Sequence, residues 1–127
     1  MKPHRPAFTL VELLIVVVII GVLAAIAIPK FQNTKGKANA AALRSDLKNL
    51  TTAEEAYFYS TGAYSSVLGN LQYSTSPGVV LTVTSASSSG FSALATHPAS
   101  FPLTCAIYIG SVSPQAPAIT EGIVGCQ

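Results

Sequence analysis

The sequence predicts an α+β fold in which one long amino-terminal helix packs on a small antiparallel sheet of three to four strands. Three stretches of different composition predict it. They are an apolar run over 8–28, a charged amphipathic stretch to residue 60, and a Ser- and Thr-rich remainder over 61–127. The chain has 127 residues, which suits one domain better than two. Its 50% hydrophobic content argues against disorder, and its net charge of +2 argues against nucleic-acid binding by bulk positive charge.

The apolar run predicts a transmembrane helix over 8–28. In this stretch 18 of 21 residues are apolar, and the exceptions are Thr9, Glu12 and Gly21. At ~1.5 Å per residue, such a helix is about 31 Å long, which matches the hydrocarbon core of a bilayer. It has no polar stripe, and a surface helix of a soluble protein would have one.

Three other interpretations of the run stay open. A buried core helix is disfavoured because so short a chain cannot cover it on all sides. An ordinary signal peptide fits the basic residues Lys2 and Arg5 and the small pair Ala25 and Ala27. The run is longer than the ~7–15 residues of a typical signal sequence, and Glu12 interrupts its start. A permanent single-span anchor is the third alternative.

The stretch after the apolar run predicts a continuation of the same helix, so that one helix covers 8–60. Leu43, Leu47, Leu50 and Tyr57 recur at helical spacing, and this face is expected to pack on the globular head. Gly62 is a plausible stop. Pro29 lacks an N–H and clashes with the preceding turn, so we expect a kink near it.

Residues 61–127 predict a small head built on a sheet. This stretch contains 19 Ser or Thr and one charged residue, Glu121. The residue types predict strands over 79–84, 91–96 and 104–109, with 71–74 as a weaker fourth candidate. Pro and Gly residues after residue 112 predict an irregular tail.

The two cysteines, Cys105 and Cys126, predict a disulfide. An even pair in an exported chain favours a bond, which would close a loop of about 22 residues and tie the tail to the last strand. Two free thiols are the alternative. Two Cys and two His are too few for a structural metal site, so we expect no metal.

No sequence motif indicates an enzyme or a cofactor. The chain contains no nucleophile elbow, no Walker loop, no zinc-protease motif and no paired catalytic carboxylates. The single His of the head, His97, lies in a predicted loop, where a surface role is the simpler explanation.

The sequence Ala-Phe-Thr-Leu-Val-Glu-Leu-Leu over 7–14 resembles the processing site of type IV pilins and their relatives. The resemblance implies that a prepilin peptidase removes a leader, residues 1–7, by cutting between Ala7 and Phe8, and that the new Phe8 amine is methylated. The family usually has Gly before the cut, where this chain has Ala7. The resemblance is strong to about Tyr64 and weak beyond it.

The resemblance implies a structural role as a major pilin that polymerises with copies of itself. The subunit would wait in the inner membrane, meet the pilus assembly machinery there, and then enter an extracellular filament. Glu12 would pair with the Phe8 amine of a neighbouring subunit. The segment from Gly21 to Pro29 would be a weak point that extends in the filament.

Two related functions are alternatives. A type II secretion pseudopilin usually carries acidic calcium ligands near its C-terminus and lacks the disulfide, whereas this chain has Glu121 alone and two Cys. A minor pilin for DNA or adhesion would need a distinctive head, and this one is nearly neutral.

The charged amphipathic part of the expected helix also has a basic face, formed by Lys37, Arg44 and Lys48 at spacings of seven and four. Such a face can bind phosphate backbones. A solvated face or salt bridges to neighbouring subunits explain it more simply, so we do not expect nucleic acid as a partner.

Overall fold

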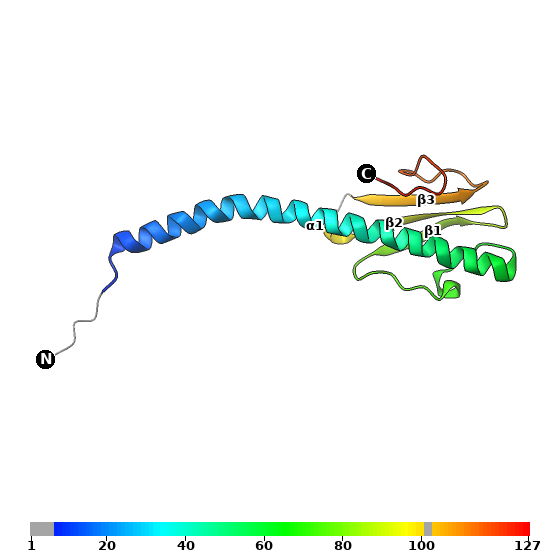
Figure 1. Cartoon of the computed structure of the whole chain (residues 1–127), viewed down its shortest axis with the longest axis horizontal. Coiled ribbons are helices and arrows are strands. Elements are labelled where there is room, and N and C mark those ends of the chain that lie inside the picture. The colour runs from blue at the N-terminus through cyan, green and yellow to red at the C-terminus, as the bar shows by residue number, and fades with distance from the viewer. Residues whose placement is uncertain (1–6, 101–102) are drawn as a thin grey trace. The chain divides into compact units, whose positions relative to one another are not determined.

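The computed structural model describes residues 7–100 and 103–127 and confirms the expected α+β architecture (Figure 1). Two compact units make up the chain, and the second spans Lys35–Gln127. The elements run in the order α1 (Leu10–Thr61), η1 (Leu68–Leu71), β1 (Val80–Ala86), β2 (Gly90–Thr96), η2 (Pro98–Ser100), β3 (Thr104–Gly110) and β4 (Gly125–Cys126), where η marks a 3₁₀ helix.

Helix α1 begins two residues after the expected start and ends one residue after the expected end. It continues through Pro29, and the kink near this residue stays a prediction. The stop at Gly62 is confirmed. Gly62 has a φ of +78°, and its N–H donates to the carbonyl of Phe58 at 2.7 Å. A left-handed glycine of this kind satisfies a helix carbonyl and turns the chain away.

The four strands form one antiparallel sheet in the order β1-β2-β3-β4. The three main strands expected from the sequence are present, each shifted or extended by one or two residues. A bulge after Val83 shifts the register of β1, so that Ser85 rather than Thr84 pairs with Ser92. Such a bulge leaves one residue unpaired and bends the strand.

One expectation about the head is wrong, and another holds only in part. Residues 71–74 do not form a strand: Leu71 closes η1, and Gln72 has a φ of 45°, which is incompatible with an extended chain. The fourth strand is instead β4, in the tail that was expected to be irregular. Strand β4 is two residues long and pairs with β3, with Cys126 opposite Cys105 in the register.

The core of the head lies between the second half of α1 and one face of the sheet (Figure 1). Leu43, Leu47 and Leu50 are 0% exposed, as their spacing predicts, and Tyr57 is half-buried. Alternate residues of β2 and β3 face the helix, because side chains of a strand alternate between its two sides. The sheet contributes Phe91, Ala93, Ala95, Cys105 and Ile107 to this core.

Candidate functional site

The first turn of α1 is closed by a reciprocal pair of side-chain hydrogen bonds. Thr9 N–H donates to Glu12 Oε2 at 2.8 Å, and Glu12 N–H donates to Thr9 Oγ1 at 3.2 Å. The Thr9 hydroxyl also donates to Glu12 Oε2, at 2.9 Å. This is a capping box, which satisfies backbone donors that a helix start leaves without partners.

Glu12 therefore has two oxygens with different roles. Oε2 accepts both bonds from Thr9, which fixes the direction of the side chain. Oε1 makes no hydrogen bond within the described residues and can accept one from another molecule. Phe8 precedes the helix and is 83% exposed, and Ala7 is also exposed. A positioned carboxylate with one open oxygen is suited to bind a cation from a second chain.

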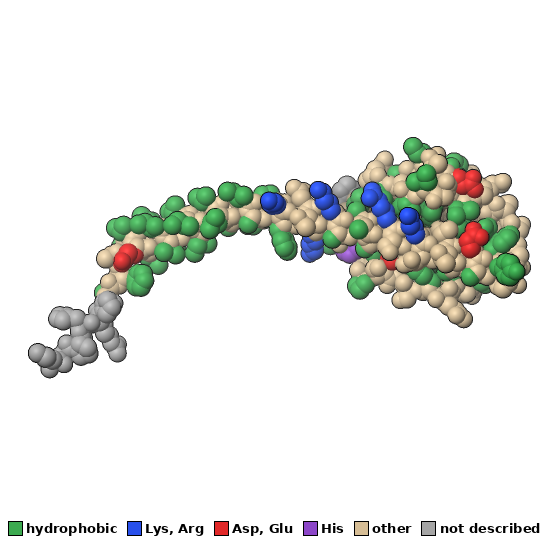
Figure 2. Space-filling model, in the orientation of Figure 1, with side chains coloured by type: hydrophobic (Ala, Val, Ile, Leu, Met, Phe, Trp, Pro, Cys, Tyr) green, Lys and Arg blue, Asp and Glu red, His purple; other side chains and the backbone are tan. Residues whose placement is uncertain are grey.

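The apolar stretch of α1 is uncovered along its whole length. Each large hydrophobic side chain from Phe8 to Ile28 is between 47% and 83% exposed, and Figure 2 shows these side chains as a nearly continuous apolar surface. By length and composition, α1 contains one segment apolar enough to cross a membrane. Exposed apolar surface of this extent marks a site that meets lipid or protein.

Gly21 and Pro29 both lie inside this helix, Gly21 within the apolar stretch and Pro29 directly after it. A Cβ atom added at Gly21 would meet nothing within 4 Å, so no contact in this chain requires glycine there. Pro29 has no N–H for the helix ladder, and Thr34 Oγ1 donates to the nearby carbonyl of Lys30 at 3.1 Å. Extension of the segment between these two residues stays a prediction.

The apolar segment matches a known protein family. The family described as "Prokaryotic N-terminal methylation motif" matches residues 3–28, which include the capping box and most of the exposed apolar surface. The amino-terminal segment is pilin-like. The pilin-like segment contains Ala7 and Phe8, and cleavage between them stays a prediction.

Curated relatives agree with the motif. The chain is 38% identical to the type IV major pilin protein PilA of Myxococcus xanthus over 77 residues, 61% of this chain and 35% of that protein. It is 47% identical to the type IV major fimbrial protein FimA of Dichelobacter nodosus over 55 residues, 43% of this chain and 35% of the relative. The type II secretion system core protein G of Pseudomonas aeruginosa is 34% identical over 71 residues, 56% of this chain and 50% of its own length. The similarity thus spans about a third to a half of the length of these relatives.

The predicted disulfide between Cys105 and Cys126 is confirmed. Cys105 and Cys126 are bonded at 2.01 Å, with their Cα atoms 4.1 Å apart. The loop between them folds back on the sheet: Ala118 is 2% exposed, and Glu121 Oε1 accepts from the N–H of Gly110 at 2.7 Å. Backbone bonds between Thr104 and Gln127 close the base of the loop.

Two buried acids of α1, Asp46 and Glu54, hold the loop between α1 and β1, and sequence reasoning missed them. The carboxylate of Asp46 accepts bonds from the N–H and the hydroxyl of Ser76, at 2.8 and 2.9 Å. Oε2 of Glu54 accepts from the N–H of Ser65 at 2.8 Å. The sequence contains a signal for the burial of Glu54, because this residue lies between Leu50 and Tyr57 in the helical spacing of the buried face.

Glu54 is 0% exposed, and its Oε1 has no hydrogen-bond partner in the described chain. Burial raises the pKa of this carboxyl, and the bond from Ser65 opposes the rise only in part. The folded head therefore binds a proton at Glu54 more tightly than the unfolded chain does. Its contribution to stability is present at low pH and is lost as the pH rises from the ordinary Glu pKa of about 4.3 toward the raised value.

We expect Glu54→Gln to flatten the pH dependence of head stability above about pH 4.3, because Gln accepts from Ser65 without a charge. Urea unfolding midpoints of the full chain in detergent, measured from pH 4 to pH 8, check this. The control is Glu55→Gln, which neutralises the adjacent exposed acid. Equal pH profiles for the two variants would contradict the expectation.

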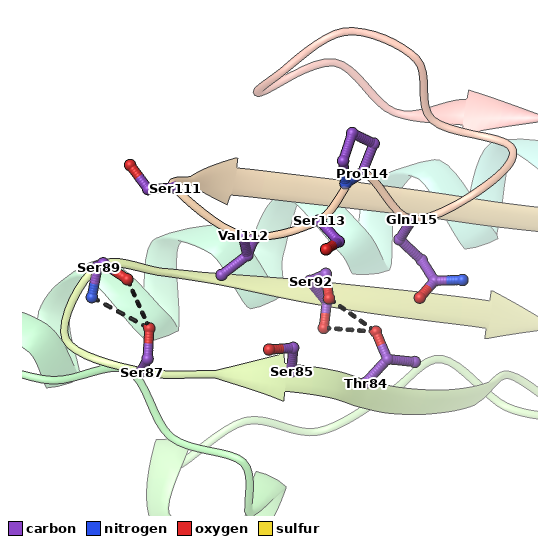
Figure 3. A pocket seen from close by; sticks show the side chains of 10 residues that line it. All are labelled: Thr84, Ser85, Ser87, Ser89, Ser92, Ser111, Val112, Ser113, Pro114 and Gln115. Atoms are coloured by element: carbon purple, nitrogen blue, oxygen red, sulfur yellow. Dashed lines mark hydrogen bonds between the residues drawn. The ribbon is translucent and has the colours of Figure 1, made fainter.

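The head also has a hydroxyl-rich groove of about 480 Å³ between β1, β2 and the segment 111–115. Figure 3 shows its Ser and Thr side chains gathered around the opening. The hydroxyl of Thr84 donates to the carbonyl of Ser92 at 3.1 Å, and it lies 2.8 Å from the hydroxyl oxygen of Ser92. The lining contains no charged side chain and no His or Cys, so the groove offers no nucleophile–base pair and no metal ligand set.

No group of three or more His, Cys, Asp and Glu able to hold a metal occurs within 7–100 and 103–127. His97 accepts the N–H of Ala99 at its Nδ1, 3.1 Å away, and its ring lies against Gly78. A Cβ at Gly78 would come within 2.5 Å of the ring, so these contacts assign the His a packing role in its loop.

Proposed function

We propose that this chain is a major pilin, a structural subunit that polymerises into a type IV pilus filament. The observation that carries the proposal is the uncovered apolar surface of α1, which coincides with the methylation motif and begins at the positioned Glu12. Relatives named as major pilin and major fimbrial proteins support it.

The physical logic is an exchange of one apolar environment for another. In the inner membrane, lipid covers the apolar stretch of α1, and in the filament the same stretches of neighbouring subunits cover one another. Glu12 then pairs through its open oxygen with the Phe8 amine of a neighbour. Such a pair adds little net stability when buried, but it selects one alignment because either charge left alone is costly.

Export fits the disulfide of the head, since such bonds persist in oxidising compartments. The partners in this proposal are other copies of the chain, a prepilin peptidase and the assembly machinery of the inner membrane. The head lies on the filament surface.

A type II secretion pseudopilin is the second candidate, because core protein G of Pseudomonas aeruginosa is among the relatives. Its support is weaker on two counts. The head contains one exposed acid beyond Glu55, which is Glu121, and it contains a disulfide.

The test is the mature N-terminus together with the assembled product. We expect mass spectrometry of the chain from its native cells to give a start at Phe8 with a methylated amine, and electron microscopy to show long surface filaments that contain it. A mature chain that starts at Ile28 would overturn the proposal in favour of an ordinary signal peptide. A correctly processed chain without surface filaments would favour the pseudopilin.

A further inference from the structure

The exposed charges around the second half of α1 are separated by sign: basic residues lie along the helix, and acidic residues lie near its carboxyl-terminal end. Lys37, Arg44 and Lys48, here called the basic stripe, are exposed, and so are Glu55 and Glu121, here called the acidic end. Asp46 and Glu54 are buried instead, and they hold the loop between α1 and β1. No ion pair joins any of these groups within the described residues, and Figure 2 shows basic side chains along the helix and acidic ones beyond them on the head.

The basic stripe and Glu55 lie on one face of the helix. Lys37 and Glu55 are 18 residues apart, which is about five full turns, so both point in the same direction. Glu55 lies about 10 Å beyond Lys48 and about 16 Å beyond Arg44 along the axis. This separation is too long for an ion pair within one copy.

Glu121 lies at the same end of the head as Glu55. Its Oε1 binds the N–H of Gly110, which pairs with Gly90 at the β1–β2 turn. The carbonyl of Ser87 in this turn accepts the N–H of Tyr64, just after the end of α1. Tyr64 in turn donates to Oε1 of Glu55 at 3.2 Å. A chain of contacts therefore places both acids at the carboxyl-terminal end of the helix.

We propose that the basic stripe of one copy docks on the acidic end of a second copy of this chain. The proposal rests on the proposed function, and it names the head surface that sets the axial offset between subunits. A parallel copy displaced by about 10–16 Å along the helix brings its Glu55 opposite Lys48 or Arg44. The contact joins unlike regions of the two copies, the basic stripe of one and the acidic end of the other, so it is heterologous.

A second copy fits the surface better than a nucleic acid does. A phosphate backbone that follows the stripe would meet Glu55 on the same face and be repelled by it, whereas a second copy supplies Glu55 as the partner of the stripe. Each exposed ion pair is weak, but the contact recurs at each subunit, and its salt dependence follows from its exposure.

The test is a charge swap in the full-length chain, with filaments sheared from cells and measured against subunit in the membrane fraction. We expect Lys48→Glu and Glu55→Lys each to reduce filaments about five-fold or more, since each replaces attraction by repulsion at every contact. The double variant Lys48→Glu/Glu55→Lys should recover most of the loss. Positions 48 and 55 are two turns apart in one copy, so recovery has to come from contacts between copies.

Lys35→Glu is the matched control. It makes the same charge change at an exposed position that points about 160° away from Lys37 around the helix, and it should leave filaments near the wild-type amount. Raising the salt to about 0.5 M should shrink the difference between the single variants and the wild type. Abundant filaments from both single variants, or a double variant no better than either, would overturn the docking while leaving the proposed function intact. A wild-type chain that forms no filaments would remove both.

Discussion

Glu12→Leu is expected to abolish filaments while the chain still enters the membrane. Leu keeps the segment apolar, so insertion persists. In the filament, however, the Phe8 amine of each neighbour would be buried without its negative partner. Breaking a buried ion pair by removing one side is strongly destabilising, and we expect the filament yield to fall about a hundred-fold or more.

The structure provides controls that separate the charge of Glu12 from its capping role. Glu12→Gln keeps an acceptor for the N–H of Thr9 and loses only the charge, so it should assemble nearly as poorly as Glu12→Leu. Thr9→Ala removes the hydroxyl that caps Glu12 and keeps the charge. Loss of a cap costs about 1 kcal/mol of helix stability, so the Thr9 variant should assemble with a reduced yield.

The measurement is the ratio of sheared filament to membrane-bound subunit, after mass spectrometry has shown that each variant is cleaved before Phe8. This step excludes a processing defect as the cause of a low yield. A wild-type yield from Glu12→Gln would show that the charge is dispensable and that capping is the role of Glu12.

The long helix and the three main strands could be predicted because local sequence determines them. Apolar spacing identified Leu43, Leu47 and Leu50 as the buried face, and the burial of these residues follows from their position on one side of a helix. Gly62 could be read as the stop because glycine adopts the left-handed conformation without a Cβ penalty.

The loop that follows the helix could not be predicted, because distant partners determine its path. Ser76 meets Asp46 across 30 positions in sequence, and Ser65 meets Glu54 across 11. The candidate strand at 71–74 failed for this reason: Tyr73 donates to the carbonyl of Asp46 on α1 instead of joining the sheet. Strand β4 was missed because two residues carry no periodic pattern, and its pairing depends on the neighbouring β3.

The candidate site divides in the same way. Glu12 was evident because an acid in an apolar run is costly to bury. Its capping bonds with Thr9 were not predicted, although the Thr-x-x-Glu spacing is that of a capping box, and the free oxygen on Glu12 became visible only from the geometry. The acidic end depends on a turn, a strand end and the helix end meeting in space, which no local pattern encodes.

Removing the disulfide by Cys105→Ala/Cys126→Ala is expected to destabilise the head by about 3 kcal/mol without changing its fold. The bond closes a loop of about 22 residues, and its main effect is to restrict the unfolded chain. The folded loop keeps other attachments, because Thr104 and Gln127 exchange two backbone bonds and Ala118 stays buried.

Urea unfolding of the full chain in detergent, followed by tyrosine fluorescence of the head, measures this loss. The unfolding midpoint should fall, and the reduced wild-type chain should show a loss of the same size as the double variant. The head would then unfold at lower stress, so filaments of the variant should lose subunits at lower temperature than wild-type filaments do. A loss well under 1 kcal/mol would contradict the expectation and would mean that the disulfide adds little to the stability of the head.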